Sequence, residues 1–172
     1  MKTLRFACMS MLIFSCTEKK AETPAAEIPT PQLPMEVTYT GKTGIGSWDN
    51  VKVVMEWNKR LSQLNTDLGD LLADSVNIHL ADGTEFSGPR DSIIQVLNTF
   101  VGQVSGLNLV YTAAVPVNNV DKNHEWVFSW TDETLTFKDG KIDHTFIHED
   151  YRLEGGKIRE IFQYSRKEPA KK

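Results

Sequence analysis

The sequence KIDHTFIHEDYRLEGGKIREIFQYSRK, from Lys141 to Lys167, decides the fold. Apolar and polar residues alternate on both sides of Gly155–Gly156, which is the period of a β-strand buried on one face. Two glycines between two such runs predict a β-hairpin, because a tight two-residue turn requires positive φ angles. Ile147 and Tyr151 share the apolar face of the first strand, and Glu149 has the same parity. If no bulge intervenes, Glu149 therefore lies inside the fold.

A carboxyl group inside a fold must pair with a cation, accept hydrogen bonds or stay protonated. Arg152 and Arg159 do not share the face of Glu149, so the sequence offers no evident ion pair for it. We therefore expect the pKa of Glu149 to be raised, because burial disfavours the charged form. The alternative is that the hydroxyl group of Tyr151 or Tyr164, or bound water, satisfies the carboxyl group.

Length and composition predict one globular domain with an acidic surface. The chain has 172 residues, of which 40% are hydrophobic, and this is enough to form a core. Lys and Arg number 19 against 23 Asp and Glu, which gives a formal net charge of −4. This balance argues against a nucleic-acid partner, since phosphates require clustered Lys and Arg.

The N-terminus is typical of an exported protein. Lys2 and Arg5 precede the apolar run Phe6–Phe14, which is too short to span a bilayer, so residues 1–15 are predicted to be a signal peptide. The run ends in LIFSC, which resembles the lipobox of bacterial lipoproteins and implies a lipid on Cys16. Signal cleavage that leaves a free Cys16 is the alternative. Cys8 would leave with the signal, so no disulfide is expected in the mature chain.

The rest of the chain divides into a tether, a domain and a tail. Residues 16–40 are rich in Pro, Ala, Glu and Thr, a composition typical of an extended tether. Residues 41–167 form the expected domain, and residues 168–172 form a tail. The lipid would tie the domain to a membrane of the cell envelope. Thr17 after the cysteine favours the outer membrane of a Gram-negative bacterium, by analogy with enteric sorting.

Helical and strand periods within the domain predict an α+β order. We expect one helix over residues 50–65, capped by Ser47 or Asp49, and a short second helix over residues 67–73. A hairpin over residues 76–86 follows, and then a third helix from Ser87 to about Ser105. From Leu107 on, the chain is predicted to form strands, with residues 126–130 and residues 135–137 on successive ones. The expected architecture is a curved antiparallel sheet covered by three helices.

This order resembles the nuclear-transport-factor-2-like superfamily, a cone-shaped fold that includes SnoaL-like cyclases and ketosteroid isomerases. The resemblance rests on Leu71–Val76, on Gly83 and Gly88, and on the ending Tyr151–Ile158, YRLEGGKI. It implies a cone with a pocket inside, and it is more specific for fold than for function.

The resemblance to the ketosteroid isomerases implies that two of their catalytic positions correspond to residues of this chain. Glu149 stands where those enzymes place the protonated carboxylic acid of the oxyanion hole. Their proton-abstracting aspartate corresponds to Leu80, which cannot take a proton. Asp82 is the nearest carboxylate, and His79 is the other candidate base.

Two functions therefore remain open. The first is a membrane-anchored binding module whose cone holds a small, largely apolar ligand, or whose sheet pairs with a second copy of the chain. The second is an enzyme that uses Glu149, Asp82 and His79 in acid–base chemistry. The expected pocket residues are Trp57, Leu80, Phe100, Trp126, Phe128, Trp130, Tyr151 and Tyr164.

No cofactor or metal is expected. His144 and His148 lie four residues apart on a strand, which separates them by about 13 Å, too far for one ion. His148 and Asp150 are two residues apart on the face opposite to Ile147. This places them on the outer face of the sheet, as a hydrogen-bonded pair at a surface or at a dimer interface.

Overall fold

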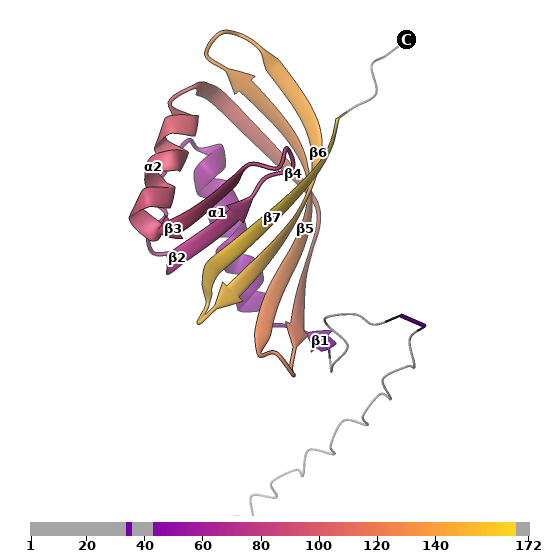
Figure 1. Ribbon diagram of the computed structural model, residues 1–172. Helices are drawn as coiled ribbons and strands as arrows, with labels where there is room; N and C mark the ends of the chain where they lie inside the picture. The colour runs from indigo at the N-terminus through magenta and orange to yellow at the C-terminus, as the bar shows by residue number, and fades with distance from the viewer. Residues whose placement is uncertain (1–33, 36–42, 168–172) are drawn as a thin grey trace, which may run out of the picture. The chain divides into compact units, whose positions relative to one another are not determined.

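A computed structural model describes residues 34–35 and 43–167 of the chain. Within residues 43–167, one sheet of seven strands is accompanied by two helices (Figure 1). The strand order is β1-β4-β5-β6-β7-β2-β3. The elements are β1 (Thr43–Ile45), α1 (Trp48–Ser62), β2 (Leu72–His79), β3 (Glu85–Pro89), α2 (Arg90–Val101), β4 (Val104–Asn119), β5 (His124–Phe137), β6 (Ile142–Glu154) and β7 (Lys157–Lys167). The predicted signal peptide, the tail and all but two residues of the predicted tether lie outside the described residues.

The predicted C-terminal hairpin is confirmed. Strands β6 and β7 pair antiparallel from Thr145↔Lys167 to Glu154↔Lys157. The turn between them is Gly155–Gly156, with φ angles of 56° and 74°. Positive φ at both turn residues is the two-residue geometry whose twist matches that of the flanking strands.

Both helices cover the same face of the curved sheet (Figure 1), and we call this the inner face. Helix α1 begins after Ser47, whose side-chain oxygen accepts a hydrogen bond from the Asp49 amide at 3.2 Å. Its Val54 and Trp57 side chains are buried at the helical spacing that the sequence predicts. The opposite face of the sheet is called the outer face below.

The predicted short helix over residues 67–73 is wrong, and the described domain has two helices, not three. Only a single turn forms there, in which the Leu71 amide donates to the Leu68 carbonyl at 3.0 Å. Strand β2 then begins at Leu72. Leu68 and Leu72 are both fully buried in the core, so this apolar stretch packs as a connection into the sheet.

The sheet is mixed, not antiparallel as predicted. Strand β2 runs parallel to β7, with Asn77↔Glu160 and His79↔Phe162 as partners. The predicted strands over residues 126–130 and 135–137 are also one continuous strand, β5. Along β5 and β6 the register has no shift, so side-chain parity holds from end to end of both strands.

The core lies between the inner face and the helices. The fully buried core side chains include those of Val54, Leu68, Leu72, Val76, Val127, Tyr151 and Ile158.

No described helix is both long enough and apolar enough to cross a membrane.

Candidate functional site

Glu149 lies on the inner face of β6, where its parity places it. Its register partners are Ser129 on β5 and Gln163 on β7. The Tyr151 hydroxyl group donates a hydrogen bond to Glu149 Oε2. Gln163 Nε2 donates to Glu149 Oε1 at 3.4 Å. The carboxyl group therefore accepts one hydrogen bond from its own strand, β6, and one from the neighbouring strand, β7.

Two further side chains complete this site, and we call the set the inner polar cluster. Asn58 of α1 points its amide group at the sheet, and Asn58 Nδ2 donates to the Tyr111 hydroxyl oxygen at 2.5 Å and to the Tyr151 hydroxyl oxygen at 3.1 Å. Helix α1 is thus tied to β4 and β6 through one amide. The cluster consists of Asn58, Tyr111, Glu149, Tyr151 and Gln163.

Asn58, Tyr111 and Gln163 were not predicted from the sequence. Asn58 follows Val54 by four residues, so it falls on the buried stripe of α1. Gln163 faces Glu149 only because the β6–β7 register shifts between Arg152 and Leu153; counting from the turn alone would place Phe162 there. A polar residue at a buried position was therefore a usable signal for Asn58 alone. Tyr111 had a weaker signal, because β4 has a register shift between Tyr111 and Ala113 that interrupts the alternation.

Burial disfavours the charged forms of Glu149, Tyr111 and Tyr151 in the cluster. Burial raises the pKa of Glu149, and the hydrogen bonds from Tyr151 and Gln163 oppose this only in part. Burial likewise raises the pKa of Tyr111 to about 12 and that of Tyr151 well above its usual value. The phenolic protons therefore stay in place near neutral pH. The pKa of Glu149 is raised, as expected, and the Tyr151 hydroxyl group, which the alternative named, is one of its hydrogen-bond partners.

A second carboxyl group, Glu133, shares the inner face. It lies on β5 between Leu109 of β4 and Thr145 of β6 in register. Burial raises its pKa to about 7, and the charges of Glu149 and Asp143 add to the effect. In residues 43–167, no hydrogen-bond donor contacts its carboxyl group. Glu133 was not predicted from the sequence, because the expected strands were divided at this point.

The expected pocket residues divide between the two faces. Trp57 and Tyr151 belong to the buried core on the inner side, and Leu80 packs against that core. Phe100 on α2 is 39% exposed. The other four residues lie on the outer face, with His148, Asp150 and Arg152 of β6 as register partners, so the eight residues do not form one pocket. They are Trp126, Phe128, Trp130 and Tyr164.

The two candidate bases lie away from Glu149. The His79 ring stacks on Phe162 with centroids 4.4 Å apart, on the outer side of the sheet. Its Nδ1 atom is 3.1 Å from Glu85 Oε1. Asp82 is exposed in the turn after β2, where its Oδ1 atom accepts from the Thr84 amide at 2.8 Å. The structure brings neither residue to the inner polar cluster.

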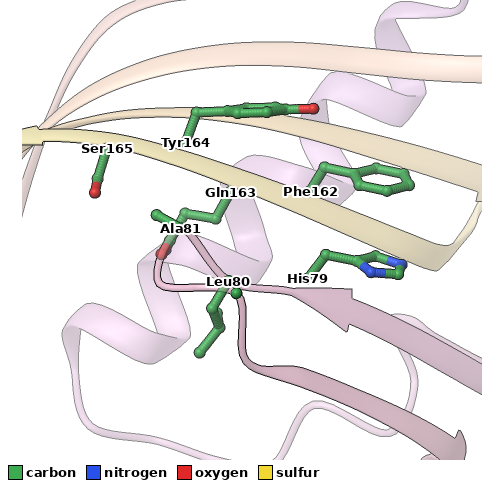
Figure 2. Close-up of a pocket in the computed structure, with 8 residues that line it drawn as sticks. His79, Leu80, Ala81, Phe162, Gln163, Tyr164 and Ser165 are labelled. Carbon is green, nitrogen blue, oxygen red and sulfur yellow. The ribbon is translucent and has the colours of Figure 1, made fainter.

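A cleft of about 360 Å³ opens where β7 runs past the end of β2. Figure 2 shows the stacked rings of His79 and Phe162 on one side of it, with Tyr164 further along β7. Gln163 lines this cleft and also contacts Glu149, so it links the cleft to the cluster. The full lining is His79, Leu80, Ala81, Gly83, Phe162, Gln163, Tyr164 and Ser165.

The outer face carries the His148–Asp150 pair, as its parity predicts. His148 Nε2 is 2.7 Å from Asp150 Oδ1. The His148 ring lies beside Trp130, with centroids 4.6 Å apart, and beside Tyr164 at 5.7 Å. Among the described residues, no group of three or more His, Cys, Asp or Glu is placed to hold a metal ion.

Comparison with known proteins identifies the architecture. No protein-family model matches the sequence, and no curated protein matches it. Solved structures do match, and among them are several proteins of this one fold. The chain has a nuclear-transport-factor-2-like fold.

Three neighbours illustrate the likeness. An LEH-like epoxide hydrolase from M. tuberculosis is 13% identical with a TM-score of 0.58, covering 69% of this chain and 83% of that one. A protein with a ketosteroid-isomerase-like fold from Catenulispora acidiphila, solved in complex with trimethylamine, is 17% identical with a TM-score of 0.55, covering 66% and 84%. A nuclear-transport-factor-2-like protein from Anabaena variabilis is 13% identical with a TM-score of 0.57, covering 73% and 96%. Likeness at these identities establishes the fold and no activity.

Proposed function

We propose that this chain is a membrane-anchored lipoprotein whose nuclear-transport-factor-2-like domain binds a small, largely apolar ligand at the inner polar cluster. The observation that carries the proposal is the Tyr111 hydroxyl group. It accepts from Asn58 Nδ2, but its own proton has no acceptor in the described part of the chain. The side chain is half-buried, so part of it is open to a ligand.

The surroundings of Tyr111 suit a mainly apolar molecule. Leu107 and Leu109 share its strand and its face, and both are half-buried. Glu149, when protonated, is a second hydrogen-bond donor on the same face. Apolar walls with few polar groups are the usual composition of a small-molecule site. The ligand that fits has an apolar body and at least one hydrogen-bonding oxygen.

Native mass spectrometry of the chain purified from its own host tests the proposal. We expect a co-purifying small molecule on the wild type and a lower occupancy on Tyr111→Phe, which loses only the hydroxyl group. Tyr164→Phe is the matched control, because Tyr164 is 53% exposed on the outer face. Equal occupancy in Tyr111→Phe and the wild type would contradict the proposal.

An acid–base enzyme is the second candidate, and Glu133 is the observation that favours it. A carboxyl group with a pKa of about 7 can both take and release a proton near neutral pH. It lies on the inner face, unlike Asp82 and His79. Chemical conversion of the co-purifying molecule by the wild type, lost in Glu133→Gln, would support an enzyme; an unchanged molecule supports binding alone.

Anchoring through Cys16 is a separate part of the proposal, and this residue lies outside the described residues. The signal-like segment before it and the Pro-rich segment after it support a lipidated N-terminus at the outer membrane. Metabolic labelling with a palmitate analogue should label the wild type and Cys8→Ala but not Cys16→Ala. Equal labelling of all three proteins would exclude a lipid on Cys16.

Self-association through the outer face is also proposed. Trp130 is 40% exposed in the middle of β5, and Tyr164 is 53% exposed towards the end of β7. Exposed apolar patches of this kind mark interaction surfaces. A second copy of the chain would cover these side chains without touching the inner polar cluster.

A further inference from the structure

We propose that the ligand of the inner face carries a basic nitrogen, which binds as an ammonium ion beside Glu133. This inference rests on the proposed function and narrows the class of ligand. It places an oxygen of the ligand at Tyr111 and Glu149, and the ammonium group at the other end of the inner face.

The first observation is that Glu133 has no partner within the described fold. Its side chain is half-buried, with Leu109 and Thr145 as its register partners. No donor or cation in residues 43–167 contacts its carboxyl group. A half-buried carboxyl group without a partner loses hydration and makes no hydrogen bond or ion pair to replace it. A cationic ligand would supply that ion pair.

The second observation is the distribution of charge around Glu133. Its nearest charged neighbours on the sheet are Glu149 and Asp143, both acidic. Lys167 lies across from Thr145 in register, but its Nζ atom is 3.3 Å from Asp143 Oδ2 and its side chain is 72% exposed. The inner face around Glu133 is therefore acidic. Lys167, the neighbouring cation in residues 43–167, is already paired with Asp143.

The helices that cover the inner face supply no cation to Glu133 either. Each basic residue of α1 and α2 is paired with another carboxylate in the structure. The pairs are Lys52–Asp49, Lys59–Glu56, Arg60–Glu56, Arg60–Asp70 and Arg90–Asp74.

The third observation is an unpartnered polar group at the opposite end of the site. Ser129 is 1% exposed, its Oγ atom has no hydrogen-bond partner among the described residues, and it faces Glu149 in register on the inner side. Four residues of β5 separate Ser129 from Glu133, which is roughly 13 Å at about 3.3 Å per residue. Ser129 and Glu133 thus lie at two ends of one row of inner-face side chains, with Thr131 between them, which suits a ligand with a polar group at each end.

Tyramine and 4-ethylphenol are a suitable probe pair, because they share a phenol ring and differ by the ammonium group. We expect tyramine to bind the wild type at least tenfold more tightly than 4-ethylphenol at pH 8 in calorimetric titrations. Tyramine affinity should fall about tenfold between pH 8 and pH 6, since a group with a pKa near 7 loses most of its charge over that range. The ammonium group itself stays charged throughout.

Glu133→Gln should bind tyramine about tenfold more weakly at pH 8, with no pH dependence, and should bind 4-ethylphenol as the wild type does. Glu133→Asp keeps the charge and should retain a pH dependence, which separates a charge effect from misfolding. Equal tyramine affinity in Glu133→Gln and the wild type would overturn the inference. If 4-ethylphenol binds and tyramine binds no better, this inference fails and the proposed function stands. If neither compound binds, both fail.

Discussion

At the scale of single residues, Glu149 is a carboxyl group held by hydrogen bonds in place of an ion pair. Its folded-state pKa is raised, so the folded chain holds the proton more tightly than the unfolded chain, where the pKa is about 4.3. Stability therefore falls as the pH rises above that value and through the folded pKa. Glutamine keeps an acceptor for the Tyr151 hydroxyl group but has no charge to bury.

We predict that Glu149→Gln stabilises the domain more at pH 8 than at pH 4. A rise of one unit in the pKa corresponds to about 1.4 kcal/mol of unfolding free energy at high pH. Denaturant melts of both proteins at the two pH values measure the difference. Glu154→Gln is the matched control, since Glu154 ends the same strand with a side chain that is 71% exposed. A Glu149→Gln variant that loses stability at pH 8 relative to pH 4 would mean that Glu149 is ionised and paired.

Tyr151 is the second residue on which the inner polar cluster depends. It is fully buried, donates to Glu149 and accepts from Asn58. Tyr151→Phe removes one hydrogen bond from each of these two buried partners, and we predict a loss of about 1–3 kcal/mol in unfolding free energy. Tyr164→Phe, on the exposed outer face, should change stability by less than about 0.5 kcal/mol. Similar losses in the two variants would show that the hydroxyl group of Tyr151 contributes nothing specific.

At the scale of elements, the Gly155–Gly156 turn starts the β6–β7 pairing, and a register shift between Arg152 and Leu153 brings Gln163 opposite Glu149. Gly155 has a φ of 56°, and an added Cβ atom would meet no heavy atom within 4 Å, so any penalty is conformational. We predict that Gly155→Ala costs about 1–2 kcal/mol and that Gly155→Asn costs less, because Asn tolerates this region. Gly44→Ala, where φ is not positive and space is also open, is the control and should be nearly neutral. Thermal unfolding of the three variants checks the order, which would be wrong if Gly44→Ala cost as much as Gly155→Ala.

Alternation in the sequence predicted the faces of β6 correctly but not those of β5, and composition explains the difference. In β6, one parity carries Ile147 and Tyr151 and the other carries His148 and Asp150, so the buried side is evident. In β5, Trp126 to Trp130 are the largest apolar residues, yet Val127 and Ser129 are the buried ones. Alternation separates two faces, but size alone does not tell which face is inside.

The parallel pairing of β2 with β7 could not be predicted from local sequence. The two strands are far apart in the chain, and their contact is fixed by the core, where Leu72 is the partner of Ile158. The same contact explains the missing short helix, because the Ile158 amide donates to the Leu71 carbonyl at 2.9 Å. This long-range hydrogen bond joins the segment to the sheet edge at the point where the local apolar spacing suggested a helix.

At the scale of the whole domain, one face of the sheet is covered by helices (Figure 1). The other face carries the exposed aromatic side chains of Trp130 and Tyr164. Burial of apolar area contributes about 25 cal/mol for each Å², so a partner that covers this face gains free energy. A second copy of the chain is a consistent partner, because a two-fold interface uses the same patch on both copies. The His148–Asp150 pair lies within that patch, beside Trp130 and Tyr164.

We predict that the chain sediments as a dimer and that Trp130→Glu shifts it to the monomer, since an isolated charge in an apolar interface is costly to desolvate. Met55→Glu is the matched control, because Met55 is 43% exposed on α1 and lies away from the outer face. It should leave the dimer intact. Circular dichroism of both variants checks that each remains folded. A monomeric wild type, or an equal effect of the two substitutions, would mean that the aromatic face serves some other partner, while ligand binding on the inner face would be unaffected.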